Sequence, residues 1–127
     1  MLHVAASLLS LSQLFTSSSS ACQVTNGGTC VTDGAGNYGF NERCTITAQV
    51  ALTLSATSFT TETNFDYLRF YNPTRTYSGT GSGPQNIQMA AGQYFRWYSD
   101  SSVVRSGWTV CGTPAAPPPP PLFTITS

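Results

Sequence analysis

Apolar and polar side chains alternate along residues 46–54, and several of the apolar ones are β-branched. This period of two residues predicts a strand with one buried face. Short apolar stretches bounded by Gly, Pro, Asn or Ser predict further strands at 65–71, 86–89, 93–98 and 108–111. No window has the period of a helix. The pattern therefore predicts an all-β sandwich or barrel.

Aromatic residues are frequent in these predicted strands. Phe95 and Trp97 share one face of a strand, and Trp108 follows a glycine in the last strand. We expect both tryptophans to pack in the core rather than to serve as sugar-stacking platforms, because small β domains depend on large buried side chains. The arginines form no cluster in the sequence, and Arg69 and Arg96 are expected to pair with neighbours or to lie along a sheet face. Greater exposure is expected for Tyr67, Tyr71, Tyr77, Tyr94 and Tyr98.

The two ends of the chain differ in composition from the middle. Residues 1–21 contain an apolar run and then small residues, which indicates a secretory signal peptide, although its front end lacks Lys and Arg. The alternative is that this segment forms a short strand or helix of the fold. Residues 114–127 include a run of prolines, which favours an extended linker or tail. Residues 22–113 then form one secreted domain, and no segment approaches the length of a membrane span.

Four cysteines lie in the expected mature protein: Cys22, Cys30, Cys44 and Cys111. Their even number in a short domain behind a signal peptide predicts two disulfides, and no Cys-x-x-Cys pair indicates a zinc site. Four cysteines allow three pairings, and the spacing does not choose among them.

Charge and composition exclude several classes of function. The chain has five Arg, no Lys and five acids, with a formal net charge of zero, and its only histidine is His3. Such a chain lacks the field that binds nucleic acid or anionic membranes. Without a histidine, a lysine or a free thiol in the mature domain, only a carboxylate pair could act as acid and base. We therefore expect no enzymatic activity.

Three of the five acids, Glu62, Asp66 and Asp100, lie in two segments at predicted strand ends. A sandwich could bring these segments together at one edge. Because Ca²⁺ takes about six to eight oxygen ligands, three carboxylates completed by carbonyls and water predict a calcium site. The alternative is that the acids are solvated or cap turns through their own backbone.

In order and spacing these motifs resemble the CUB family of extracellular modules. The resemblance covers about residues 22–113, and it implies an antiparallel β-sandwich of the jelly-roll type. It also implies that Glu62, Asp66 and Asp100 hold Ca²⁺, helped by the Ser102 region, and that Tyr38 orients Glu62 from behind. The residues that carry it are Asn37-Tyr38, Cys44, Phe59, Glu62, Phe65-Asp66-Tyr67-Leu68, Ser78-Gly79, Trp97-x-Ser99-Asp100-x-Ser102 and Gly107-Trp108.

The chain departs from the family pattern in two ways. The loop between Glu62 and Asp66 is shorter, and the second family disulfide is missing. In these respects the chain is similar to the compact version of the domain found in secreted proteins of protists and algae. The first family bridge implies a Cys22–Cys44 disulfide, and Cys30 could then join Cys111 if their strands are neighbours.

The resemblance implies a function in recognition. In the family, the calcium site accepts a Lys or Arg side chain of an extracellular partner protein, so binding depends on calcium and weakens with salt. The alternatives are a carbohydrate-binding module that uses exposed aromatic residues and a purely structural module of a cell-surface or matrix assembly. A hydrolase would need two carboxylates that face a cleft.

Overall fold

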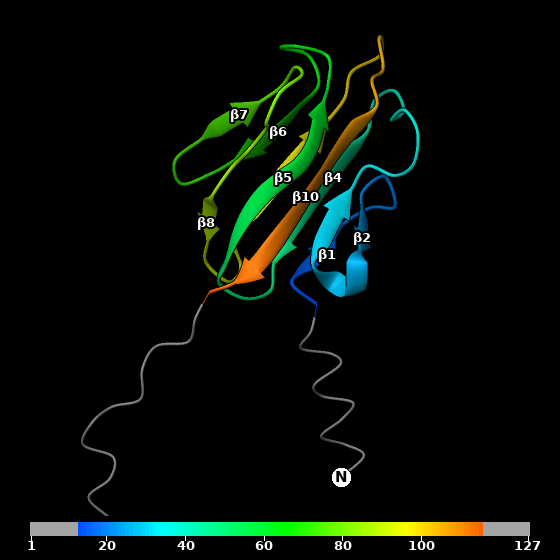
Figure 1. Cartoon of the computed structure of the whole chain (residues 1–127). Coiled ribbons are helices and arrows are strands. Elements are labelled where there is room, and N and C mark those ends of the chain that lie inside the picture. Colours follow the sequence, from blue (N-terminus) through cyan, green and yellow to red (C-terminus); the bar gives the residue numbers. More distant parts are fainter. Residues whose placement is uncertain (1–12, 116–127) are drawn as a thin grey trace, which may run out of the picture.

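The computed structural model describes residues 13–115 (Figure 1). They form ten strands and one short 3₁₀ turn, Asn26–Gly28, and among them no helix is long and apolar enough to cross a membrane. The strands are β1 (Phe15–Ser17), β2 (Gln23–Thr25), β3 (Cys30–Thr32), β4 (Arg43–Ala48), β5 (Leu52–Thr60), β6 (Tyr67–Phe70), β7 (Arg75–Tyr77), β8 (Ile87–Met89), β9 (Tyr94–Tyr98) and β10 (Gly107–Pro114).

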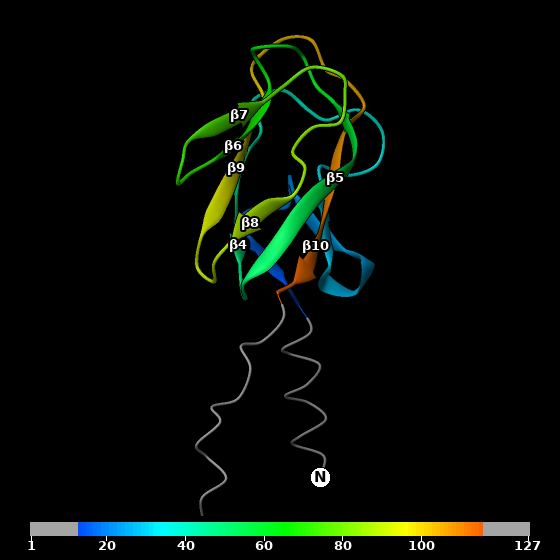
Figure 2. The same ribbon diagram turned by 60° about the vertical axis from the view of Figure 1, so that its left-hand side comes forward.

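The strands form two antiparallel sheets of five strands each, packed as a β-sandwich. One sheet has the order β1-β4-β9-β6-β7, and the other has the order β2-β3-β10-β5-β8. Figure 2 shows the layers from a second direction, with β6, β7 and β9 in one and β5, β8 and β10 in the other. The all-β sandwich expected from the alternation pattern is confirmed.

The core lies between the two sheets and is rich in aromatic side chains. Trp97 on β9 and Trp108 on β10 are each 1 % exposed, and their rings meet edge to face with centroids 5.7 Å apart. Phe95 stacks on Phe70 of the neighbouring strand at 4.7 Å. Aromatic side chains of this size contribute most of the buried apolar area in a small domain, so the expected core role of both tryptophans is confirmed.

The strand expected over residues 46–54 is instead two strands in different sheets. β4 ends at Ala48 and β5 begins at Leu52, and the chain turns between them. Ile46, Ala48, Leu52 and Leu54 are all buried, and Val50 packs partly against the core. Because the alternation keeps its phase through the turn and no Gly or Pro marks the break, the hydrophobic pattern alone could not reveal the change of sheet.

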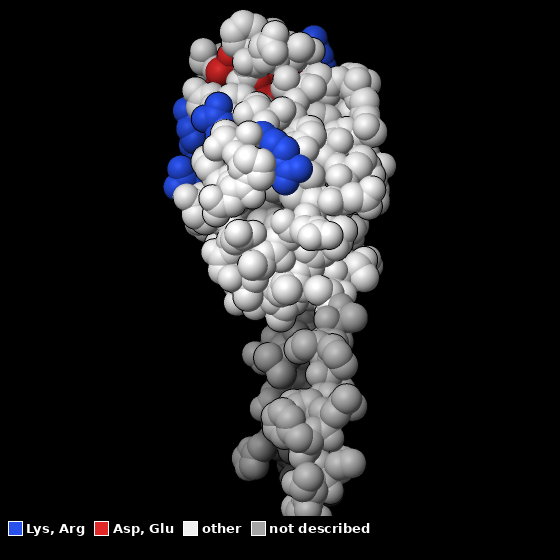
Figure 3. Space-filling model, turned by 90° about the vertical axis from the view of Figure 1, so that its left-hand side faces the viewer, with Lys and Arg blue, Asp and Glu red and all other residues white. Residues whose placement is uncertain are grey.

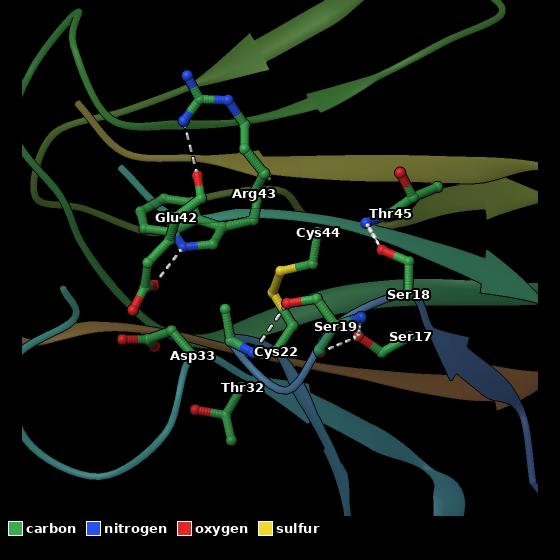
Figure 4. Close-up of a disulfide and its surroundings, with 12 residues drawn as sticks. Ser17, Ser18, Ser19, Cys22, Thr32, Asp33, Glu42, Arg43, Cys44 and Thr45 are labelled. Carbon is green, nitrogen blue, oxygen red and sulfur yellow. Dashed lines mark hydrogen bonds between the residues drawn. A yellow bond between two sulfur atoms is a disulfide. The ribbon is translucent and has the colours of Figure 1, made fainter. Parts of the chain in front are cut away.

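The fold begins before the boundary expected at Cys22. Residues 15–17, assigned to the signal peptide from composition, form β1 and pair with β4, and Phe15 is fully buried. The serine run after β1 satisfies backbone groups: Thr45 N–H donates to Ser18 Oγ and Ala21 N–H to Ser19 Oγ (Figure 4). The rest of the expected signal peptide, residues 1–12, and nearly all of the expected linker, residues 116–127, lie outside the described residues.

Two disulfides join the four cysteines in the expected pairing: the first was implied by the family resemblance, and the second was expected if the strands of Cys30 and Cys111 are neighbours. Cys22 is bonded to Cys44, which links the segment before β2 to β4 of the other sheet, and Figure 4 shows this bridge. Cys30 is bonded to Cys111, which lies directly opposite on the neighbouring strand β10. Both disulfides are typical of a protein that folds in an oxidising environment.

Three loops meet at one end of the sandwich, opposite the end where the described chain begins and finishes (Figure 1). They connect β3 to β4, β5 to β6, and β9 to β10, and they span residues 33–42, 61–66 and 99–106. All candidate metal ligands expected from the sequence lie on these loops.

Candidate metal centre

The loop end of the sandwich brings together the three acids that the sequence singled out. Glu62, Asp66 and Asp100 each offer a carboxylate oxygen, and these oxygens lie within 4.8 Å of one another. Glu62 follows β5, Asp66 precedes β6, and Asp100 follows β9. Since β6 and β9 are neighbours in one sheet while β5 belongs to the other, the site bridges both layers of the sandwich.

The short loop between Glu62 and Asp66 is a tight turn. The carbonyl oxygen of Glu62 accepts hydrogen bonds from the backbone N–H groups of Phe65, at 3.3 Å, and Asp66, at 3.1 Å. Asn64 has φ of 70°, a left-handed conformation that asparagine tolerates well, and its N–H donates to Ser78 Oγ. The shortening relative to the family therefore leaves Glu62 and Asp66 on the same side of the loop.

Asp66 is the most enclosed of the three acids, with no exposed surface. Its Oδ2 accepts a hydrogen bond of 2.6 Å from the Tyr38 hydroxyl, and its Oδ1 accepts one of 2.8 Å from the backbone N–H of Asp100. Each oxygen keeps a second lone pair free to face a cation. Both hydrogen bonds fix the carboxylate rotamer, which is the usual role of groups behind a metal ligand.

Tyr38 contacts the cluster differently from what the family resemblance implied. Its hydroxyl donates to the Asp66 side chain and accepts from the backbone N–H of Glu62 at 3.0 Å. It therefore orients the Asp66 carboxylate and the Glu62 backbone, and no hydrogen bond joins it to the Glu62 side chain among the residues described. Burial and the nearby Asp66 carboxylate raise the pKa of Tyr38 above its ordinary value, so the hydroxyl remains a proton donor.

Asp100 is held by the loop between β9 and β10. Its Oδ1 accepts from the backbone N–H of Ser102 at 3.2 Å, and its carbonyl oxygen accepts from the N–H of Asn41 at 2.8 Å. Ser102 is exposed, and its contact with the site is the hydrogen bond from its backbone N–H, which positions the Asp100 side chain. Direct ligation by the Ser102 region stays a prediction.

One oxygen of the Glu62 carboxylate is left without a hydrogen bond to the described residues. This atom, Oε1, is buried. Desolvation and the neighbouring carboxylates of Asp100 and Asp66 raise the pKa of Glu62, and Arg105 opposes this effect. A buried, unpaired oxygen beside two further carboxylates is the arrangement that a bound cation would stabilise.

The donor set fits a hard cation. It consists of the carboxylate oxygens of Glu62, Asp66 and Asp100, and it contains no sulfur or imidazole. Such ligands suit Ca²⁺, which accepts irregular geometry and completes its shell with carbonyls and water, better than Zn²⁺ or copper. The residues present therefore fit the ion that the family resemblance implied.

Exposed apolar side chains surround this end of the molecule. Phe40, Phe65 and Val103 are 59 %, 56 % and 41 % exposed, and they are three of the four large apolar residues exposed in the described chain. Each belongs to a different one of the three loops. The loops that carry the acids therefore also carry most of the large exposed apolar residues of the described chain.

Two groups near the site could not be recognised from the sequence. Thr61 is buried, donates from its hydroxyl to the carbonyl of Asp66 and accepts from the N–H of Gly79. Arg105 lies close enough to Glu62 to affect its ionisation. Both roles depend on contacts between segments that are distant in the chain, so they cannot be predicted from residue type alone.

Comparison of the chain with models of known protein families, with curated proteins and with solved structures found no match.

Proposed function

We propose that this protein is a secreted, non-enzymatic recognition module that binds Ca²⁺ at the loop end and uses this site to bind a basic side chain of an extracellular protein. The observation that carries the proposal is the convergence of Glu62, Asp66 and Asp100, whose oxygens lie within 4.8 Å of one another. A bound cation would offset the mutual repulsion of three carboxylates held this close.

A protein partner fits the surroundings of the acids better than a neutral ligand does. Calcium carries two charges, so three ionised carboxylates leave the filled site with a net negative charge that attracts Lys or Arg. The exposed Phe40, Phe65 and Val103 around it supply the apolar area that protein interfaces use. The CUB resemblance supports the same function.

The two disulfides support a location outside the cell, because such bridges persist in oxidising compartments. The signal peptide expected from the sequence supports secretion as well. Cleavage after Ala21, the boundary expected from the sequence, would remove the buried strand β1.

A calcium titration read by thermal unfolding tests the proposal. An ion that binds only the folded state stabilises it by about 2.7 kcal/mol at a concentration one hundred times the dissociation constant. For a domain of this size that corresponds to a rise of roughly 10–20 °C in Tm. Mg²⁺ at the same concentration should raise Tm less, because it demands a more regular shell.

Two variants make the titration specific. Glu62→Gln keeps the shape of the side chain but removes the unpaired carboxylate, and it should abolish the calcium-dependent rise. Asp33→Asn removes an acid outside the cluster and should leave the rise intact. The proposal is refuted if Tm of the wild type does not respond to calcium, or if both variants lose the response equally.

A further inference from the structure

The outer face of the β1-β4-β9-β6-β7 sheet carries a second feature, which does not depend on the proposed calcium site. A hollow of about 340 Å³ lies on this face over β4, β9 and β6. No acid is among the described residues that line it. Its most prominent side chains are three arginines and three tyrosines, namely Arg43, Arg69, Arg96, Tyr67, Tyr71 and Tyr98.

The arginines gather here although they form no cluster in the sequence, and Arg69 and Arg96 lie along a sheet face as expected. Arg43 comes from β4, Arg96 from β9 and Arg69 from β6, and these strands are neighbours. Figure 3 shows blue arginine side chains gathered on the upper part of the molecule, with the red acids close to its top. Every second side chain of a strand points to the same face of the sheet. Neighbouring strands can therefore bring residues that are distant in the chain together on one face.

Two of the arginines lie directly opposite each other. Arg69 and Arg96 are partners in the antiparallel register of β6 and β9. Like charges at such positions destabilise a sheet, and no acid lines the hollow to compensate. The opposed arginines Arg69 and Arg96 make the fold less stable, and their presence is explained if an anion binds between the two guanidinium groups.

Tyrosine rings lie against the arginines. The guanidinium carbon of Arg43 lies 3.6 Å from the centroid of Tyr98, and that of Arg69 lies 4.8 Å from the centroid of Tyr67. Arg96 lies 5.1 Å from the centroid of Tyr94. These cation–π contacts orient the guanidinium groups before any ligand arrives and leave most of their N–H donors unused.

The tyrosines form two pairs, one on either side of the opposed arginines. Tyr67 and Tyr98 have ring centroids 4.9 Å apart, and Tyr71 and Tyr94 have centroids 5.1 Å apart. Tyr94 and Tyr98 are four residues apart on one strand, which separates the two pairs by about 13 Å. The face is therefore an elongated strip with rings at its ends and positive charge at its centre.

We infer that this strip binds an anionic polysaccharide, a chain of sugars that carries sulfate or carboxylate groups. The aromatic faces provide stacking surfaces for sugar rings, and the paired guanidinium groups bind an acidic substituent between them through charge-assisted hydrogen bonds. A neutral sugar chain would leave the opposed arginines uncompensated. A nucleic acid would also offer anions and stacking rings, but the two disulfides indicate an oxidising environment, where acidic polysaccharides are the more common polyanions.

Binding to four probes in a calcium chelator tests this inference: sulfated dextran, polygalacturonate, neutral dextran and a single-stranded oligothymidylate. We expect binding to sulfated dextran or to polygalacturonate, and the preferred one identifies the acidic group. Neutral dextran should not bind. The inference is wrong if neither acidic polysaccharide binds, or if the oligothymidylate binds as tightly with the same dependence on salt, since that would indicate attraction to any polyanion.

Single-charge variants locate the site. Arg96→Gln should weaken binding by about tenfold or more and flatten its salt dependence. Arg75→Gln is the matched control, because Arg75 is exposed on β7 and does not line the hollow. Equal losses in both variants would overturn the inference.

Stability measurements separate a loss of binding from a loss of fold. The double variant Arg69→Gln/Arg96→Gln removes the like-charge pair, so Tm should stay the same or rise while binding is lost. Tyr71→Leu should weaken binding without changing its salt dependence, because it removes a stacking surface and no charge. A double variant that binds as the wild type does contradicts the assignment.

Discussion

Removing the hydroxyl group of Tyr38 tests the hydrogen-bond network that holds the acidic cluster together. In Tyr38→Phe, Asp66 Oδ2 loses a donor at 2.6 Å and the Glu62 backbone N–H loses an acceptor at 3.0 Å. Tyr38 is 3 % exposed and Asp66 has no exposed surface, so water has little access to replace the hydroxyl. The first bond involves a charged acceptor and contributes about 1.5–3 kcal/mol, and the second contributes roughly 1 kcal/mol.

The variant should therefore lose about 2–4 kcal/mol of unfolding free energy, measured by urea denaturation in a calcium chelator. Its m-value should not change, because the surface exposed on unfolding is the same. Tyr77→Phe is the matched control: Tyr77 is half-buried, its hydroxyl makes no hydrogen bond to the described residues, and its loss should cost less than about 0.5 kcal/mol.

Calcium affinity gives a second measurement on the same variant. Groups that orient a metal ligand typically affect metal affinity by about ten- to a hundredfold when removed, so the calcium dissociation constant of Tyr38→Phe should rise by this amount. A loss of stability within about 0.5 kcal/mol of that in Tyr77→Phe, together with unchanged calcium affinity, would refute the role assigned to Tyr38.

Two further predictions concern pH and the disulfides. Burial raises the pKa of Asp33 from 3.8 to about 6, so the folded protein binds this proton more tightly than the unfolded chain does, and stability should fall as pH rises from about 4 to 6 and then level off. The loss is roughly 1–2 kcal/mol, because a partly solvated carboxyl gains less stability than the full pKa shift implies. Asp33→Asn should remove this part of the pH dependence of the urea midpoint. The prediction is contradicted if the variant keeps the wild-type slope of urea midpoint against pH. The Cys30–Cys111 bridge spans 81 residues and Cys22–Cys44 spans 22, so replacing the first pair by serine should cost about 4–5 kcal/mol and the second about 3 kcal/mol. Equal costs would show that loop length does not govern either bridge.

Strands with clear alternation or turn-forming neighbours could be predicted from the sequence. β6, β8, β9 and β10 each begin within two residues of the expected position, because Gly, Pro and Asn residues mark their ends. Strands β1, β2, β3 and β7 have three residues each and are too short to show a period; β8 is equally short and was found only from the turn residues beside it. β1 also has the composition of a signal peptide, and only its pairing with β4 and the burial of Phe15 show that it belongs to the fold.

The acidic cluster was predictable because acids are scarce in this chain. The chain has five acids in all, so three that lie at the ends of predicted strands stand out. In a sandwich, strand ends can lie only at one of the two ends of the domain. The partner of Tyr38 was not predictable, since it depends on the rotamer of Asp66. The arginine strip was hidden for a related reason: the opposition of Arg69 and Arg96 follows from the register of β6 and β9, and register is decided by the packing of the opposite, buried face.

The two surfaces place opposite charges on different parts of a neutral molecule. Charged residues make up 8 % of the chain, yet three of the five acids form one cluster at the loop end and three of the five arginines lie on one sheet face. At physiological salt the screening length is about 8 Å, so each surface acts on its immediate surroundings even though the net charge is zero. Calcium bound at the acidic cluster would neutralise two of its three negative charges, whereas no carboxylate lines the hollow with the arginines to bind it. Removing calcium should therefore abolish binding at the loop end only, whereas raising the salt concentration should weaken binding at both surfaces, and a partner that responds to both treatments can be assigned to the loop end.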